Sequence, residues 1–228
     1  MTYSNRAFIF DMDGTLVDNM RYHTEAWRTL MEENGHQFDE HRFLVETAGQ
    51  TNREIIPGVF GAMSNERLSE LALRKEELYR EAYLLHRTPV PGLVHFLEAG
   101  HQLGIKMAVS TAASPANMAF ILDGLDLRKY FGALTTAADV KRGKPDPEIF
   151  LLSAARLGVD PANSIVFEDA FFGFEAAKRA GMIAVGLTTV NSAEDIMRTG
   201  SVVEVHTDYT SMRPADLIDK YLPFKEVL

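Results

Sequence analysis

The sequence predicts an α/β protein whose core is a doubly wound parallel sheet, with a helical segment inserted after the first strand. The first observation is a short apolar run at residues 7–10 that ends in acidic residues. The second is the stretch from residue 18 to about residue 86, where strand patterns disappear and apolar residues recur at helical spacing. The third is an alternation of short apolar runs with helical segments from residue 92 onward. The first strand is therefore separated in sequence from the strands beside it.

The first strand carries two carboxylates to one end of this sheet. Residues 7–10 are apolar and aromatic, as is typical of a buried strand, and Asp11 and Asp13 follow at once. Open parallel sheets hold their ligands at the carboxyl ends of the strands, and side chains two residues apart share a face. Gly14 permits a sharp turn after them. Two acids placed in this way can bind a hard cation or divide the roles of nucleophile and acid–base group.

The inserted segment is predicted to form helices with Trp27 in their core. Their expected bounds are residues 23–34, residues 40–47, a third helix that starts at Asn52 and is stopped by Pro57-Gly58, and a long fourth helix that Ser64 caps and that continues to Leu85. Pro89, Pro91 and Gly92 mark the return to the alternating pattern.

Five more strands are expected, at residues 105–109, 132–136, 164–167, 183–187 and 202–205. Helices are predicted to start near Ser114-Pro115, Asp146-Pro147 and Gly173, with the two prolines at the first helical position.

Three further polar groups follow the predicted strands. Thr111 ends one strand before a helix start, where a hydroxyl and free amides can bind an anion. Lys144 lies in a loop between glycine and proline and can direct a point charge at a phosphoryl oxygen. Glu168 and Asp169 end another strand, and carboxylates crowded against Asp11 repel one another unless a cation such as Mg²⁺ compensates them.

Composition narrows the classes of partner. The net charge of −9 argues against nucleic acid or an anionic membrane as the main partner. The chain has no cysteine, which excludes disulfides and thiolate chemistry. Without a signal-peptide pattern or an apolar run long enough to span a membrane, we expect a cytoplasmic protein. The sequence leaves the oligomeric state open, and a monomer is compatible with it.

Taken together, these motifs resemble those of the haloacid dehalogenase superfamily. The motifs that carry the resemblance are Asp11-x-Asp13-Gly14-Thr15, Thr111, Lys144-Pro145 and Glu168-Asp169, in that order. The chain is most similar to the subfamily with a helical cap after the first motif, the β-phosphoglucomutase-like sugar-phosphate phosphatases. The resemblance implies a Rossmann-like core from residues 1–15 and 88–228 and a helical cap from residues 16–87.

The resemblance also implies roles for the acidic residues. Asp11 would be the nucleophile that takes the phosphoryl group as an aspartyl-phosphate, and Asp13 would protonate the leaving oxygen and then activate water. Mg²⁺ would be held by the side chain of Asp11, the backbone carbonyl of Asp13 and the carboxylate of Asp169, with Glu168 assisting.

The phosphoryl oxygens would be bound by Thr111, the amide of Ala112 and Lys144. The substrate would be a small phosphorylated metabolite, a sugar phosphate. The candidates for substrate specificity lie in the cap, and they are His23, Gln50, Thr51 and Asn52.

Other activities compete with hydrolysis. Dehalogenases of the family lack the second acid that Asp13 supplies, and phosphonate-cleaving members need a cap lysine, whereas this chain has none before Lys75. A phosphosugar mutase would need basic cap residues where Ala48 and Asn52 stand, although Arg53 is adjacent. Hydrolysis is therefore favoured, with a mutase as the alternative and a catalytically idle binding domain as a third possibility.

Overall fold

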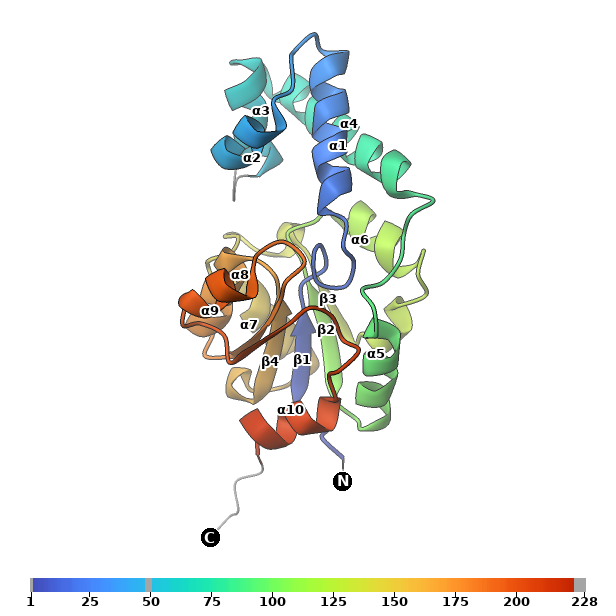
Figure 1. Cartoon of the computed structure of the whole chain (residues 1–228), viewed down its shortest axis with the longest axis vertical. Helices are drawn as coiled ribbons and strands as arrows, with labels where there is room; N and C mark the ends of the chain where they lie inside the picture. The colour runs from blue at the N-terminus through green and yellow to red at the C-terminus, as the bar shows by residue number, and fades with distance from the viewer. Residues whose placement is uncertain (1, 48–50, 224–228) are drawn as a thin grey trace. The chain divides into compact units, whose positions relative to one another are not determined.

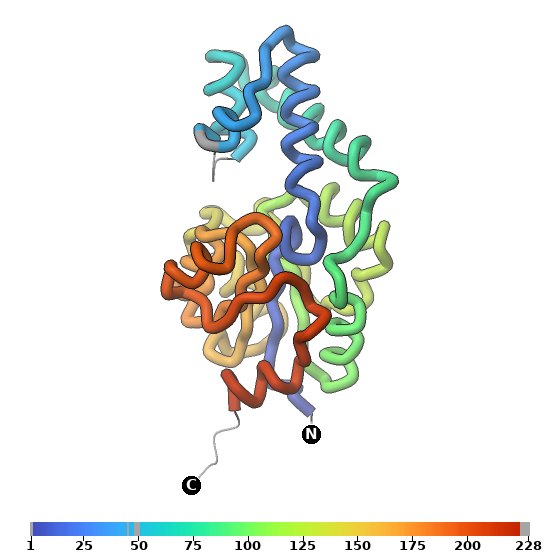
Figure 2. The backbone as a smooth tube through the Cα atoms, in the orientation of Figure 1, coloured from blue at the N-terminus to red at the C-terminus, as the bar shows by residue number. Residues whose placement is uncertain are grey.

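The computed structural model describes residues 2–47 and 51–223. Two compact units divide the chain, one made of Met1–Asp18 and Thr88–Leu228 and the other of Asn19–Arg87. The first unit is thus built from both ends of the chain, whose path is traced in Figure 2.

A six-stranded parallel sheet in the order β3-β2-β1-β4-β5-β6 forms the centre of the first unit (Figure 1). Its strands are β1 (Ala7–Phe10), β2 (Lys106–Ser110), β3 (Ala133–Thr135), β4 (Ser164–Glu168), β5 (Ile183–Leu187) and β6 (Glu204–His206). The predicted α/β fold with a parallel sheet is confirmed. The last strand begins two residues later and ends one residue later than expected, and just before it the amide of Val203 donates to the carbonyl of Ala184 at 2.9 Å.

The central strand β1 is buried on both faces. Ala7 and Ile9 point into a hydrophobic cluster that contains Phe150 and Phe174, whereas Phe8 stacks on the ring of Phe96 on the opposite face with centroids 5.5 Å apart. Because alternate side chains lie on opposite faces, helices cover both sides of the sheet. In register, Phe10 pairs with Val109 of β2 and Phe167 of β4, so the ends of these three strands lie together.

The helices of this unit are α5 (Leu93–Gln102), α6 (Pro115–Leu122), α7 (Glu148–Leu157), α8 (Phe171–Arg179), α9 (Ala193–Arg198) and α10 (Pro214–Tyr221). Ser114 caps α6 by accepting from the amide of Asn117 at 3.2 Å, with Pro115 first in the helix as predicted. Pro147 was expected at the first position of α7 but precedes the helix, because its carbonyl accepts the first helical hydrogen bonds. Across the described residues, no helix combines the length and apolarity that a bilayer crossing needs.

The second unit contains α1 (Met20–Glu33), α2 (Glu40–Thr47), α3 (Asn52–Phe60) and α4 (Asn65–Tyr83). Trp27 of α1 is buried in its core, as expected, and α1 packs along α4. The prediction that Pro57 stops the third helix is wrong, since α3 continues to Phe60. Burial of Ile55 and Ile56 stabilises α3 enough to tolerate one missing backbone donor.

Candidate active site

Asp11 continues the line of β1 into the carboxyl edge of the sheet. Its amide donates to the carbonyl of Phe167 at 3.0 Å, which extends the pairing between β1 and β4 by one residue. The residue is only 7% exposed. Pairing on both sides of β1 therefore fixes the position of this carboxylate within a largely buried environment.

The turn after Asp11 depends on a glycine. Gly14 adopts a left-handed φ of +78°, and its amide donates to the carbonyl of Val17 at 2.7 Å. A Cβ atom on Gly14 would lie 2.2 Å from Oδ2 of Asp169, far inside van der Waals contact. The turn and the Asp169 carboxylate can be this close only because residue 14 has no side chain.

The end of β4 positions the other two acids. Oε2 of Glu168 accepts hydrogen bonds from the amides of Asp169 and Ala170, both at 2.9 Å, at the start of α8. A Cβ on Gly173 would lie 1.9 Å from Oε1 of Glu168, so this carboxylate also needs a glycine beside it. The helix N-terminus favours the negative charge placed there.

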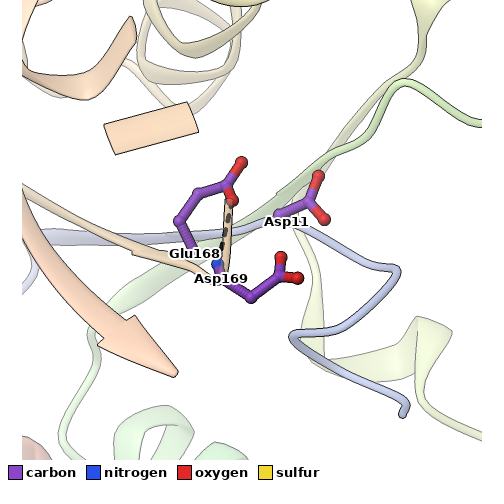
Figure 3. A group of neighbouring side chains, drawn as sticks. All are labelled: Asp11, Glu168 and Asp169. Atoms are coloured by element: carbon purple, nitrogen blue, oxygen red, sulfur yellow. Dashed lines mark hydrogen bonds between the residues drawn. The ribbon is translucent and has the colours of Figure 1, made fainter. Parts of the chain in front are cut away.

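Asp11, Glu168 and Asp169 form one buried cluster (Figure 3). Each offers a carboxylate oxygen, and the three oxygens all lie within 4.8 Å of one another. Figure 3 shows the carboxylates of Asp11 and Asp169 on neighbouring strand ends and that of Glu168 turned back toward the amide of Asp169. The structure thus brings together the three acidic side chains that the sequence suggested for a metal.

Lys144 inserts its ammonium group into this cluster. Its Nζ atom lies 2.6 Å from Oδ1 of Asp11 and 2.5 Å from Oε1 of Glu168, and 4.9 Å from the ring centroid of Phe150. The lysine comes from the loop before α7 and precedes a cis peptide bond to Pro145. Three carboxylates and one ammonium leave a formal charge of −2 in the cluster.

Burial and crowding govern the protonation of these groups. Burial raises the pKa of Asp11, the ammonium of Lys144 partly opposes that shift, and the charges of Glu168 and Asp13 add to it. The pKa of Asp169 is raised well above its ordinary value by burial and then by Glu168 and Asp11. Burial lowers the pKa of Lys144, but the two carboxylates that it contacts more than offset this, so the pKa is raised overall. The cluster is therefore electrostatically suited to a cation.

Asp13 lies at the edge of the cluster and not in it. The residue is partly exposed, and its carboxylate is outside the group of three, although its charge still acts on Asp11.

Thr111 and Ala112 follow β2, next to Asp11 along the same edge of the sheet. Thr111 is 1% exposed, and its hydroxyl oxygen accepts from the amide of Ala113 at 3.0 Å, which leaves the hydroxyl hydrogen free to donate elsewhere. Ala112 is exposed.

The segment after β5 also contacts the site, which the sequence did not indicate. The side-chain amide of Asn191 donates to the carbonyl of Asp169 at 2.8 Å, and the hydroxyl of Thr189 donates to the carbonyl of Gly14. Both residues follow the strand beside β4, and this neighbouring position is the one signal that could have identified them.

Two of the predicted specificity residues are linked inside the helical unit. His23 contacts Nζ of Lys75 through Nδ1 at 2.8 Å, and Lys75 pairs with Glu76 at 3.0 Å. Asn52 donates to the same carboxylate oxygen of Glu76 at 2.5 Å. Lys75 is 4% exposed, and no pattern in the sequence connects it or Glu76 with His23 and Asn52.

The structure describes only one of the two remaining specificity candidates, Thr51 and Gln50. The amide and the hydroxyl of Thr51 both donate to Glu54, at 2.7 and 2.8 Å, so this hydroxyl is used in starting α3. Gln50, together with Ala48, lies outside the described residues.

Comparison with known proteins agrees with this geometry. The family model for haloacid dehalogenase-like hydrolases matches residues 5–181, so the chain belongs to that family of enzymes, as the motifs led us to expect.

Among its relatives, fructose-1-phosphate phosphatase YqaB of Escherichia coli (strain K12) is 39% identical over 179 residues, which are 78% of this chain and 93% of that protein. A phosphorylated carbohydrates phosphatase of Thermotoga maritima is 35% identical over 204 residues, covering 87% of this chain and 93% of the relative. The crystal structure of β-phosphoglucomutase from Clostridium difficile superposes with a TM-score of 0.82 at 29% identity and covers 97% of both chains.

Proposed function

We propose that this protein is a Mg²⁺-dependent phosphatase that hydrolyses a small sugar phosphate through an aspartyl-phosphate on Asp11. The observation that carries the proposal is the convergence of Asp11, Glu168 and Asp169 around the ammonium of Lys144 at one edge of the sheet. The relatives named as phosphatases of fructose 1-phosphate and of phosphorylated carbohydrates support the substrate class.

The donor set fits Mg²⁺. Its oxygens are hard ligands, the formal charge of −2 matches a divalent ion, and Gly14 leaves room for the carboxylate of Asp169 against the turn. We assign the ion to the carboxylates of Asp11 and Asp169 and the backbone carbonyl of Asp13, with Glu168 assisting. When bound, Mg²⁺ would supply charge neutralisation at the phosphoryl oxygens.

The chemistry divides between two acids. A carboxylate oxygen of Asp11 forms a bond to phosphorus while the bond to the leaving oxygen breaks, and Asp13 gives its proton to that oxygen. A water molecule then attacks phosphorus and loses its proton to Asp13, the bond to Asp11 breaks, and inorganic phosphate leaves. The partial exposure of Asp13 suits a group that exchanges protons with the leaving group and with water.

The phosphoryl oxygens need donors around them. In the proposal the hydroxyl of Thr111, the amide of Ala112 and the ammonium of Lys144 fill this role, because phosphoryl transfer depends mainly on positioning and charge neutralisation. Lys144 is positioned for it by its contacts with Asp11 and Glu168. With the metal bound, the formal charge of −2 in the cluster would fall to zero, so that the ammonium of Lys144 can bind an anionic substrate although the net charge of the protein is −9.

We assign substrate selection to the helical unit acting as a cap, through His23, Gln50, Thr51 and Asn52. A phosphosugar mutase is the second candidate, favoured by the similarity to β-phosphoglucomutase. It would have to bind a second phosphate. Asn52 is neutral and donates to the carboxylate of Glu76, so it is poorly suited to that task. Hydrolysis is therefore the function that we favour.

Phosphate release from an aryl phosphate with and without Mg²⁺ tests the proposal. Asp11→Asn should lower the rate about 10⁴-fold, because the nucleophile is lost, whereas Asp126→Asn, the same change at an exposed position of the same unit, should leave it unaltered. A rate near that of the wild type for Asp11→Asn would refute the covalent route. Interconversion of hexose 1- and 6-phosphates that requires a bisphosphate activator would favour the mutase instead.

A further inference from the structure

Two adjacent phenylalanines on the first turn of α8 face solvent. Phe171 is 44% exposed and Phe172 is 49% exposed, and Val190, in the segment after β5, is 50% exposed. In the part of the chain that the structure describes, neither phenyl ring stacks on another aromatic ring. Exposed aromatic surface of this kind is unfavourable in water and commonly marks a place where a ligand or partner binds.

These three residues, which we call the apolar rim, lie beside the acidic cluster. Strands β4 and β5 are neighbours in register, with Glu168 opposite Gly186, so the segments that follow them leave the same edge of the sheet side by side. Phe171 is two residues beyond Asp169. The hydrogen bond of 2.8 Å from Asn191 to the carbonyl of Asp169 holds the Val190 segment against the start of α8.

The rim is built on rigid backbone. The start of α8 is held by the two hydrogen bonds that backbone amides donate to the carboxylate of Glu168, and by the close packing of that carboxylate on Gly173. A surface that is ordered before binding loses little conformational entropy when a ligand packs on it. The rim offers carbon surface and no side-chain donor or acceptor, so it is unsuited to the phosphoryl group itself.

We propose that the apolar rim recognises the C–H face of a ring in the leaving group of the substrate. The inference rests on the proposed phosphatase function and adds a substrate class to it: phosphorylated carbohydrates that contain a five- or six-membered ring. The acidic cluster and Lys144 bind the phosphoryl end, and Phe171 and Phe172 contact carbon atoms of the group attached to it. Aromatic faces next to a few convergent polar groups are the usual composition of a small-molecule site.

The test compares ring and acyclic substrates in the double variant Phe171→Ala/Phe172→Ala. For phenyl phosphate and a cyclic hexose phosphate, kcat/KM should fall about ten-fold, mostly through KM, because packing against the ring is lost. For glycerol 3-phosphate, which has no ring, it should change less than about two-fold. Phe171→Tyr/Phe172→Tyr keeps the ring faces and should retain the preference for ring substrates.

Met197→Ala is the matched control, since Met197 is also 50% exposed but lies in the last turn of α9. It should leave all three substrates unaffected. An equal loss on ring and acyclic substrates, or no loss on either, would overturn the proposal. So would concentration-dependent self-association that the double variant abolishes with unchanged kinetics, since the rim would then join two copies of the chain.

Calorimetric binding separates this inference from the proposed function. If the wild-type protein binds phenyl phosphate more tightly than glycerol 3-phosphate and the double variant does not, the rim recognises rings whether or not turnover occurs. If hydrolysis proceeds but binding shows no ring preference, the phosphatase stands and the rim inference fails.

Discussion

Replacing Gly14 by alanine tests whether the close approach of the turn to Asp169 is needed for the proposed metal site. The new Cβ would lie 2.2 Å from Oδ2 and 2.6 Å from Cγ of Asp169, where real Cβ contacts are essentially never below 3.0 Å. The carboxylate must therefore move by about 0.8 Å or more. Metal ligand distances tolerate only about ±0.2 Å, so Asp169 can no longer bind in its native position.

The expected result has two parts. Alanine at a φ of +78° costs about 1–2 kcal/mol in stability from backbone strain alone. Loss of the Asp169 position should in addition weaken Mg²⁺ binding about 10–100-fold, as measured by isothermal titration calorimetry on the folded protein.

Gly181→Ala isolates the strain. Gly181 belongs to the same unit and has a φ of +71°, but its added Cβ would meet nothing within 4 Å. This variant should therefore lose a similar amount of stability and bind Mg²⁺ like the wild type. If the two variants bind the ion equally well, the close contact at Gly14 has no part in metal binding.

Two further predictions concern stability in urea denaturation. A glycine-to-alanine change inside a helix normally increases stability by about 1 kcal/mol. For Gly173→Ala we expect instead a loss of about 1–3 kcal/mol, because the new Cβ would lie 1.9 Å from the Glu168 carboxylate, displace it and break the two hydrogen bonds that it accepts from backbone amides. A gain in stability would contradict this. The hydrogen bond from Arg156 and those from Thr136 lower the pKa of Asp139 to about 2. The stabilisation from the ionised Asp139 is fully present above the unfolded-state pKa near 4 and is lost as pH falls toward 2. Asp139→Asn should therefore lower the free energy of unfolding by about 1 kcal/mol at about pH 7, allowing for solvent screening, and by progressively less below about pH 4. A cost independent of pH would refute that assignment.

The sequence predicted the parallel sheet and the meeting of Asp11 with Glu168 and Asp169 for one physical reason. Parallel strands bring their carboxyl ends to the same edge, so residues far apart in the chain can be placed together from strand bounds alone. Glycine at residue 14 was recognised as a turn, but its contact with Asp169 could not be foreseen. That contact depends on the side-chain rotamer of a residue 155 positions away.

Predictions from local sequence failed where tertiary packing determines the structure. Pro57 is a helix breaker by propensity, yet it lies inside α3 because neighbouring isoleucines are buried. The link from His23 through Lys75 and Glu76 to Asn52 joins three helices, and only the packing of α1 and α3 on α4 creates it. A lysine and a glutamate on an acidic helix carry no sequence signal that they are buried partners.

The chain leaves the sheet unit and returns to it at neighbouring points. The amide of Val90 donates to the carbonyl of Leu16 at 2.9 Å, and Val17 forms a bridge with Pro89. The segment that leaves the sheet unit and the segment that returns to it are thus bonded to each other within that unit. An insertion with such adjacent ends can be lengthened, shortened or exchanged for another without disturbing the sheet. On the proposed role of the helical unit in substrate selection, grafting a different helical segment between these two points should change the substrate range and leave the reaction unchanged.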